Sequence, residues 1–429
     1  MLTSKNKWIR LTLILLMSLL VIGPFAQAKP VQAQSPTPVG VACTYGPAFT
    51  LVAESGYIQL PDMNTMFMWS FAPAGGVFQY PGPVLCVNEG DTVTVILQNN
   101  DPNTNTLNRI NVPVSMMFPG QVDVMANGVP AQPDLANNSL TTVALPGQSV
   151  TYSFVASRPG TFIYESGTDT KMQVAMGLFG ALIVRPAMGA NYVYNRADSQ
   201  FTAGEEFLAL LSEIDPYQHQ AVEMGKTYNM DNYRARYWLI NGRGFPDSIA
   251  DNFASWLPNQ PYGALARIHP YDPVNHPYPG VERFINVGTE EYPFHPHANN
   301  GLMIGRDGYP LEDGGLDLSM EKFAFNIGPG QTWDVIFKWY DAENYSPANP
   351  VPVTVPDLVN VTLGMFYSGS PYLGVMETLP PGSSTLNQCG EYYIISHNHA
   401  LFQLDSFNMT MSGPITYLRV DPPLPNNCP

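Results

Sequence analysis

Basic residues are scarce in this 429-residue sequence, which has 19 Lys and Arg against 35 Asp and Glu and a formal net charge of −16. Nothing in it resembles the basic stripe with which proteins bind nucleic acid, so no nucleic-acid partner is expected. A Ser-His-Asp signature, a nucleophile elbow and a phosphate-binding glycine loop are also missing.

Long apolar runs are absent after the N-terminal region, where residues 11–22 form an apolar run behind three basic residues. This run is short for a membrane-spanning helix, which needs roughly 20 residues. Small residues follow it, so the pattern predicts a secretory signal peptide over residues 1–28, cleaved after Ala28 or Ala33, and then a linker over residues 29–41. An uncleaved membrane anchor is the alternative. We expect a secreted protein, periplasmic or extracellular, with no membrane span after cleavage.

Cysteine is rare, with four residues at Cys43, Cys86, Cys389 and Cys428. An even number in an exported chain indicates two disulfides, for which three connectivities exist. We favour the local pairings Cys43–Cys86 and Cys389–Cys428. None of the four has the close spacing of a thiolate metal site, so we expect structural cross-links.

Gly, Pro and aromatic residues are abundant, with 36 Gly, 41 Pro and 12% aromatic residues, whereas only 13% of the residues are charged. Short apolar runs bounded by turn residues are typical of an all-β protein. The expected strands lie at residues 67–71, 92–97, 151–155, 161–164, 177–184, 206–211 and 237–243.

Two parts of the sequence repeat one another in the same order. Residues 145–154 are echoed by 328–337, and residues 158–164 by 388–394. Such a repeat predicts two copies of one β-sandwich, domain 1 over residues 42–187 and domain 2 over 188–429. The second copy carries an insertion at about residues 340–387. The insertion is either a recognition element or a loop that covers the sandwich.

Four of the seven histidines form two His-X-His pairs, His295 with His297 and His397 with His399. Residues i and i+2 of a strand point the same way, so each pair presents two imidazoles on one face. Imidazole ligands suit copper, zinc or nickel. The alternative is that they are hydrogen-bonded interior histidines. The other three, His219, His269 and His276, have no matched spacing, and we expect the last two, each followed by Pro, in turns.

Five segments resemble the multicopper oxidase family, in the order in which that family has them: 83–95, 159–167, 176–184, 292–297 and 397–399. The resemblance implies two cupredoxin-like Greek-key β-sandwich domains with long loop insertions. It also implies a mononuclear copper held by one Cys and two His, and a trinuclear cluster held by four His-X-His pairs. The third pair corresponds to His295 and His297 and the fourth to His397 and His399.

The other copper-ligand positions of this resemblance carry different residues. The first pair falls on Met117 and Pro119, and the second on Glu165 and Gly167. Glu165 either offers a carboxylate to a metal or is an exposed residue at a strand end, and Met116 and Met117 are either soft ligands or core residues.

The ligand positions of the mononuclear, electron-entry copper also carry other residues. Its positions fall on Tyr292, Asn398 and Gln403, with Met409 near the axial position. Blue copper needs a thiolate, so a working electron-relay oxidase is not expected.

These observations predict a multicopper-oxidase-like protein with at most one residual metal site, copper or alternatively zinc, at His295, His297, His397 and His399. A binding or assembly role is the first hypothesis, and a copper-dependent oxidoreductase using this reduced site is the second. Catalytic residues, substrate and protein partner stay unassigned. A homotrimer is expected only by analogy with two-domain members of the family.

Overall fold

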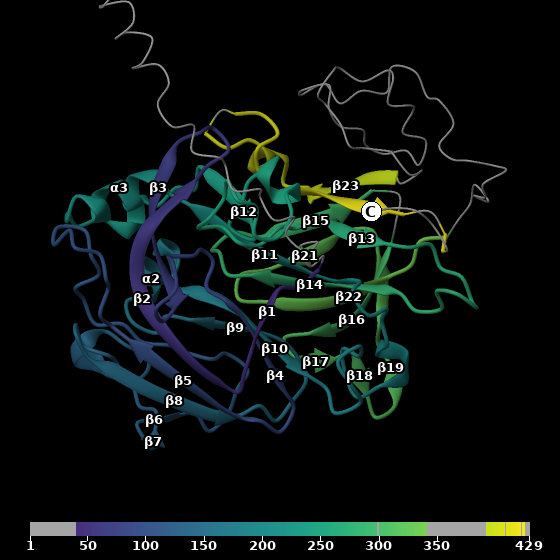
Figure 1. The fold of residues 1–429 in the computed structure, drawn as a ribbon, viewed down its shortest axis with the longest axis horizontal. Coiled ribbons are helices and arrows are strands. Elements are labelled where there is room, and N and C mark those ends of the chain that lie inside the picture. Colours follow the sequence, from purple (N-terminus) through teal and green to yellow (C-terminus); the bar gives the residue numbers. More distant parts are fainter. Residues whose placement is uncertain (1–39, 298–299, 341–391, 408, 422, 425–429) are drawn as a thin grey trace, which may run out of the picture. The chain divides into compact units, whose positions relative to one another are not determined.

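The computed structural model describes residues 40–297, 300–340, 392–407, 409–421 and 423–424 (Figure 1). The predicted signal peptide, nearly all of the linker, the insertion at about residues 340–387, and the expected Cys389–Cys428 pair lie outside the described residues. Within the described part, no helix is long and apolar enough to span a membrane.

Strands dominate the described chain, and its two α-helices, α2 (Thr170–Met176) and α3 (Pro216–Glu223), are short. Two sheets form a first sandwich. One has the order β1 (Cys43–Tyr45), β4 (Val84–Asn88), β10 (Phe179–Arg185), β9 (Gly160–Glu165). The other has the order β3 (Thr65–Pro73), β2 (Ala48–Gln59), β5 (Thr92–Gln98), β8 (Ser149–Val155), β6 (Met125–Ala126), β7 (Val129–Pro130).

Two further sheets form a second sandwich. One has the order β12 (Tyr237–Ile240), β11 (Glu206–Ile214), β14 (Gly280–Asn286), β22 (Thr332–Phe337), β16 (Gly301–Arg306), β17 (Tyr309–Pro310), with β20 (Met320–Lys322) also on β16. The other has the order β13 (Ala266–Ile268), β24 (Ile415–Val420), β23 (Tyr392–Asn398), β15 (Tyr292–Pro296), β21 (Phe325–Ile327). A small hairpin pairs β18 (Glu312–Asp313) with β19 (Leu316–Asp317).

Apolar side chains fill three interfaces between these sheets. One core lies inside the first sandwich and includes Phe71, Leu97 and Tyr164. Another lies inside the second sandwich and includes Phe284 and Phe294. A third joins β4, β9 and β10 of the first sandwich to β11, β12 and β14 of the second. Strands β10 and β11 are therefore buried along their whole length, as expected where both faces of a sheet are covered.

The predicted repeat appears in the strand pairing. In the first sandwich β2 pairs parallel with β5, and β5 antiparallel with β8. In the second, β11 pairs parallel with β14, and β14 antiparallel with β22. The all-β fold with two β-sandwiches is confirmed, and each expected strand in the described residues overlaps an observed one. The division into domains near residue 187, between β10 and β11, stays a prediction.

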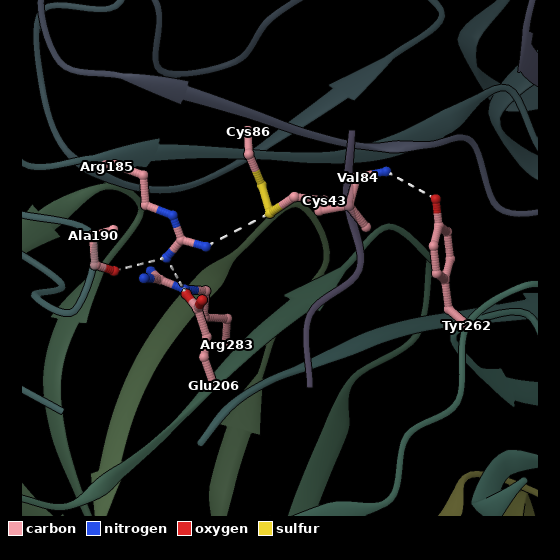
Figure 2. Close-up of a disulfide and its surroundings, with 8 residues drawn as sticks. All are labelled: Cys43, Val84, Cys86, Arg185, Ala190, Glu206, Tyr262 and Arg283. Carbon is pink, nitrogen blue, oxygen red and sulfur yellow. Dashed lines mark hydrogen bonds and ion pairs between the residues drawn. A yellow bond between two sulfur atoms is a disulfide. The ribbon is translucent and has the colours of Figure 1, made fainter. Parts of the chain in front are cut away.

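The disulfide between Cys43 and Cys86 is confirmed and joins β1 to β4 (Figure 2). Beside it, Arg185 reaches Glu206 with an N–O distance of 2.5 Å. Glu206 also pairs with the fully buried Arg283, which in turn contacts Asp334 on β22 at 3.0 Å. Charged groups thus cross the apolar interface between the two sandwiches as a paired network.

Candidate metal centre

The four paired histidines are brought together by two neighbouring antiparallel strands, β15 and β23. In their register, His295 lies opposite His397. The pairing continues beyond β15, because the His297 N–H donates to the Ile395 carbonyl and the His399 N–H to the Pro293 carbonyl. Neighbouring residues of β15, such as Phe294, point into the core of the second sandwich instead. The predicted convergence of the two pairs is therefore present in the structure.

The imidazoles form a closed ring. Their centroids are 5.0 Å apart for His295 and His297, 5.1 Å for His297 and His397, 5.5 Å for His397 and His399, and 5.1 Å for His399 and His295. The Nε2 atoms of His297 and His397 are 3.1 Å apart. Two ligands of one ion bound at 2.0–2.1 Å lie about 3.3 Å apart in tetrahedral geometry, so this pair is spaced as two ligands would be.

Backbone carbonyls orient two of the rings. The Nδ1 atom of His295 is 2.7 Å from the Phe323 carbonyl oxygen, and Nδ1 of His397 is 2.8 Å from the Asn398 carbonyl oxygen. A carbonyl can only accept, so each Nδ1 carries the proton and each Nε2 keeps its lone pair. This is the outer-shell arrangement that prepares histidine to bind a metal.

The electrostatic environment favours the neutral form of two of the rings, His297 and His397. Burial, together with the neighbouring rings His397, His295 and His399, lowers the pKa of His297 to about 4. Burial is also the main cause that lowers the pKa of His397, and the His295 and His399 rings lower it further. Neutral imidazole is the form that coordinates metals, and a set of imidazole nitrogens suits copper.

The four imidazoles are nevertheless too far apart to bind one ion as they stand. No three of the four rings offer ligand atoms that all lie within 4.8 Å of one another. A single ion bound by all four nitrogens would therefore need His295 and His399 to turn toward the His297–His397 pair. His399 is exposed, so its ring has room to turn.

The positions of the electron-entry copper are filled by a buried hydrogen-bond network. The Tyr292 hydroxyl donates to a Glu213 carboxylate oxygen at 2.6 Å. The Asn398 amide donates to Gln403, whose own amide donates to Glu290 at 2.6 Å. Tyr292, Asn398 and Gln403 are at most 1% exposed. Amide and phenol groups that are hydrogen-bonded to carboxylates do not provide the thiolate and imidazoles of a blue-copper site.

The positions of the first two pairs form a counterpart in the first sandwich. Met117 and Glu165 are opposite each other in an antiparallel bridge, as His295 and His397 are in the second sandwich. Glu165 ends β9 but is half-buried, and burial raises the pKa of its carboxyl group. Of the two alternatives for Glu165, the strand-end position is observed, but the side chain is half-buried rather than exposed. Among the described residues, no hydrogen bond, ion pair or ring contact joins it to the four histidines.

Two residues that the sequence placed in turns belong to a second cluster. His269 follows β13, and His276 lies in the loop before β14; both contact Glu205, which precedes β11. Their ligand atoms all lie within 4.8 Å of one another. No spacing signal reveals this cluster, because its members come from three separate positions in the chain. Met116, in contrast, is a fully buried core residue, one of the two alternatives considered.

Known proteins similar to this chain are copper proteins. Residues 77–189 match the multicopper oxidase family. L-ascorbate oxidase of Cucurbita pepo var. melopepo is 31% identical over 185 residues, which cover 42% of this chain and 29% of that protein. The copper-containing nitrite reductase of Pseudomonas chlororaphis is 31% identical over 173 residues, which cover 38% of this chain and 43% of that protein. The match thus spans less than half of the length of either relative.

Solved structures share the fold over most of the chain. The structure of the multicopper oxidase mgLAC matches with a TM-score of 0.58 and 20% sequence identity, covering 89% of this chain and 87% of that one. At this level of sequence identity, the structural match supports a shared fold and not a shared function. The family match over residues 77–189, the similar ascorbate oxidase and nitrite reductase sequences, and the shared cupredoxin architecture together make this chain similar to the multicopper oxidases, with a cupredoxin-like fold.

Proposed function

We propose that this protein is an exported copper-binding cupredoxin protein that uses His295, His297, His397 and His399 as ligands and does not operate an electron relay. The observation that carries the proposal is the antiparallel register that sets His295 opposite His397 and places the Nε2 atoms of His297 and His397 3.1 Å apart. The similarity of residues 77–189 to the multicopper oxidase family supports copper as the ion. Zinc is the alternative ion, because imidazole ligands suit it as well.

The lack of a relay is supported by the network at Tyr292, Asn398 and Gln403. A mononuclear copper at this place would need to displace hydrogen bonds to two acidic residues, Glu213 and Glu290, and would find no thiolate. Bound copper would supply a redox-active Lewis acid at the four histidines, while burial favours the neutral, metal-binding form of His297 and His397. A role in binding or assembly outside the cell follows.

A copper-dependent oxidoreductase is the second candidate, and a cleft beside His295 favours it. The cleft has a volume of about 800 Å³ and is lined by His295, Phe323, Tyr278 and Lys338, among others. A cavity of this size accommodates a small organic molecule. In this candidate the reductant would reach the metal centre directly, since no second copper would pass electrons to it.

Assembly and location belong to the same proposal. His399 is the exposed member of the four-histidine group. In a homotrimer, a neighbouring subunit would cover the group at this residue. The predicted signal peptide supports secretion. Light scattering at micromolar concentration tests the trimer, for which a monomeric mass would be the contrary result.

Copper loading followed by elemental analysis and electron paramagnetic resonance tests the first candidate. We expect bound copper without blue-thiolate character, and its loss in a His297→Ala/His397→Ala variant. A copper content near zero after loading would contradict the proposal. Oxygen uptake with a phenolic or a metal-ion reductant separates the two candidates, because turnover that disappears in His397→Ala would establish the oxidoreductase. An exposed control, Lys322→Ala on β20, should change neither result.

A further inference from the structure

A second group of potential metal ligands lies at the end of the second sandwich where β11 and β14 begin and β13 ends. Nδ1 of His269 is 2.8 Å and Nε2 of His276 is 3.0 Å from the same Glu205 oxygen, Oε1. The loop that holds His276 is fixed, because Asp272 and His276 exchange two backbone hydrogen bonds. The Glu205 N–H is bonded to the Thr202 carbonyl. All three ligands are therefore held by ordered backbone.

The two carboxylate oxygens of Glu205 differ in the number of hydrogen bonds that they accept. Oε1 of Glu205 accepts three donors, the two rings and the His269 N–H at 3.0 Å. Among the described residues, neither Oε2 of Glu205 nor Nδ1 of His276 has a hydrogen-bond partner, although both atoms are buried. The Glu205 and His276 side chains are each only 5% exposed. A buried carboxylate oxygen without a partner costs free energy, and a cation would remove that cost.

A second carboxylate lies on the side of the His269 ring that faces away from Glu205. Oδ2 of Asp421 is 3.8 Å from Nε2 of His269, the ring nitrogen that faces away from Glu205. Asp421 is fully buried and held by Arg267 and Arg419, each at 2.6 Å. Histidines that bind metals commonly donate their other ring N–H to such a carboxylate, and a shift of His269 by about 1 Å toward Asp421 would form this hydrogen bond.

We propose that Glu205, His269 and His276 form a binding site for a divalent transition metal, with Zn²⁺ as the best match, and that Asp421 orients His269. Two imidazoles and one carboxylate make a three-ligand zinc set that leaves a fourth position open. The nitrogen-to-oxygen distances of 2.8 and 3.0 Å need to lengthen only to about 3.3 Å for a tetrahedral ion. His269, 22% exposed, gives the ion access from solvent.

This site is separate from the four-histidine centre. On β24, Ile415 pairs with His397, whereas Val420 pairs with Tyr392 and directly precedes Asp421. Five residues along a strand span about 17 Å, so one ion cannot serve both places. The proposal therefore does not depend on copper binding at His295, His297, His397 and His399.

Zinc titration of the full chain tests the site, with Zn²⁺ alone as the probe and equilibrium dialysis as the measurement. We expect a His397→Ala/His399→Ala variant, which lacks the other centre, to retain one Zn²⁺ per chain. Adding Glu205→Gln, which keeps the shape and the acceptor, should weaken this binding more than 100-fold. Asp421→Asn should weaken it 10- to 100-fold, the range for outer-shell partners, and Asp421→Glu should restore part of the loss. Glu312→Gln, at a surface carboxyl, is the matched control.

Zinc content near zero in the His397→Ala/His399→Ala chain, or unchanged affinity in Glu205→Gln, would overturn the proposal and leave the group as a set of ion pairs. Anomalous scattering from zinc-soaked crystals of the unmutated chain gives a result even if a variant does not fold. A peak between Glu205, His269 and His276 supports the site, and its absence at full zinc occupancy elsewhere contradicts it. Neither result bears on copper at the four-histidine centre, which is measured separately.

Discussion

Replacing Gln403 with Leu tests whether the network at the electron-entry position now stabilises the fold. Gln403 is 1% exposed, accepts from the Asn398 amide and donates to Glu290 at 2.6 Å. Leucine has a similar size but makes neither bond. The Asn398 amide would be left buried without a partner, which costs about 1–3 kcal/mol, and Glu290 would lose a charge-assisted bond worth about 1.5–3 kcal/mol. Glu290 keeps its bond from Trp238 at 2.9 Å.

The expected loss of unfolding free energy for Gln403→Leu is therefore about 3–5 kcal/mol. Urea unfolding followed by circular dichroism measures it, as a shift of the midpoint at an unchanged slope. Leu401→Gln is the matched control, since Leu401 belongs to the same short helical turn but is 60% exposed, and its effect should stay within about 0.5 kcal/mol. A loss below about 1 kcal/mol for Gln403→Leu would refute the view that this hydrogen-bond network stabilises the fold.

Three other predictions concern stability. Burial lowers the pKa of His219 to about 4 despite its contacts with the carbonyls of Phe67 and Ala175, so its neutral form stabilises the fold above pH 6.5 and this contribution is lost as the pH falls toward 4. His219→Gln should flatten that part of the stability–pH curve in urea unfolding. Removing the Cys43–Cys86 disulfide, which spans 43 residues, should cost about 4 kcal/mol in a Cys43→Ala/Cys86→Ala variant, measured by denaturant unfolding; an unchanged midpoint would contradict this. Arg283→Met should lower the free energy of unfolding by about 3–5 kcal/mol, because the buried carboxylates of Glu206 and Asp334 each lose a partner. Arg306→Met, which removes an exposed ion pair, should lower it by at most about 1 kcal/mol. Equal effects of the two substitutions in thermal unfolding would contradict a role of burial.

Local patterns in the sequence predicted the fold and half of the site. Apolar runs between turn residues gave the strands, and the period of two in a strand placed His295 with His297 and His397 with His399. That the two pairs meet was an expectation from resemblance, since only the register of β15 on β23 brings them together. Glu213 and Glu290 could not be assigned to Tyr292 and Gln403, because acidic residues outside any periodic pattern carry no sign of their partners. His269 and His276 were interpreted as turn residues for the same reason, and Glu205 is more than 60 residues away from both.

The bridge between Met117 and Glu165 is formed without any contribution from their side chains. The N–H of each residue donates to the carbonyl of the other, at 2.7 and 3.1 Å, so the hydrogen bonds that fix the spacing involve only backbone atoms. Side chains at these two places are therefore free to change without loss of the strand pairing. The register of these two strands therefore depends on the backbone alone, and the fold at this place tolerates a wide choice of side chains at positions 117 and 165.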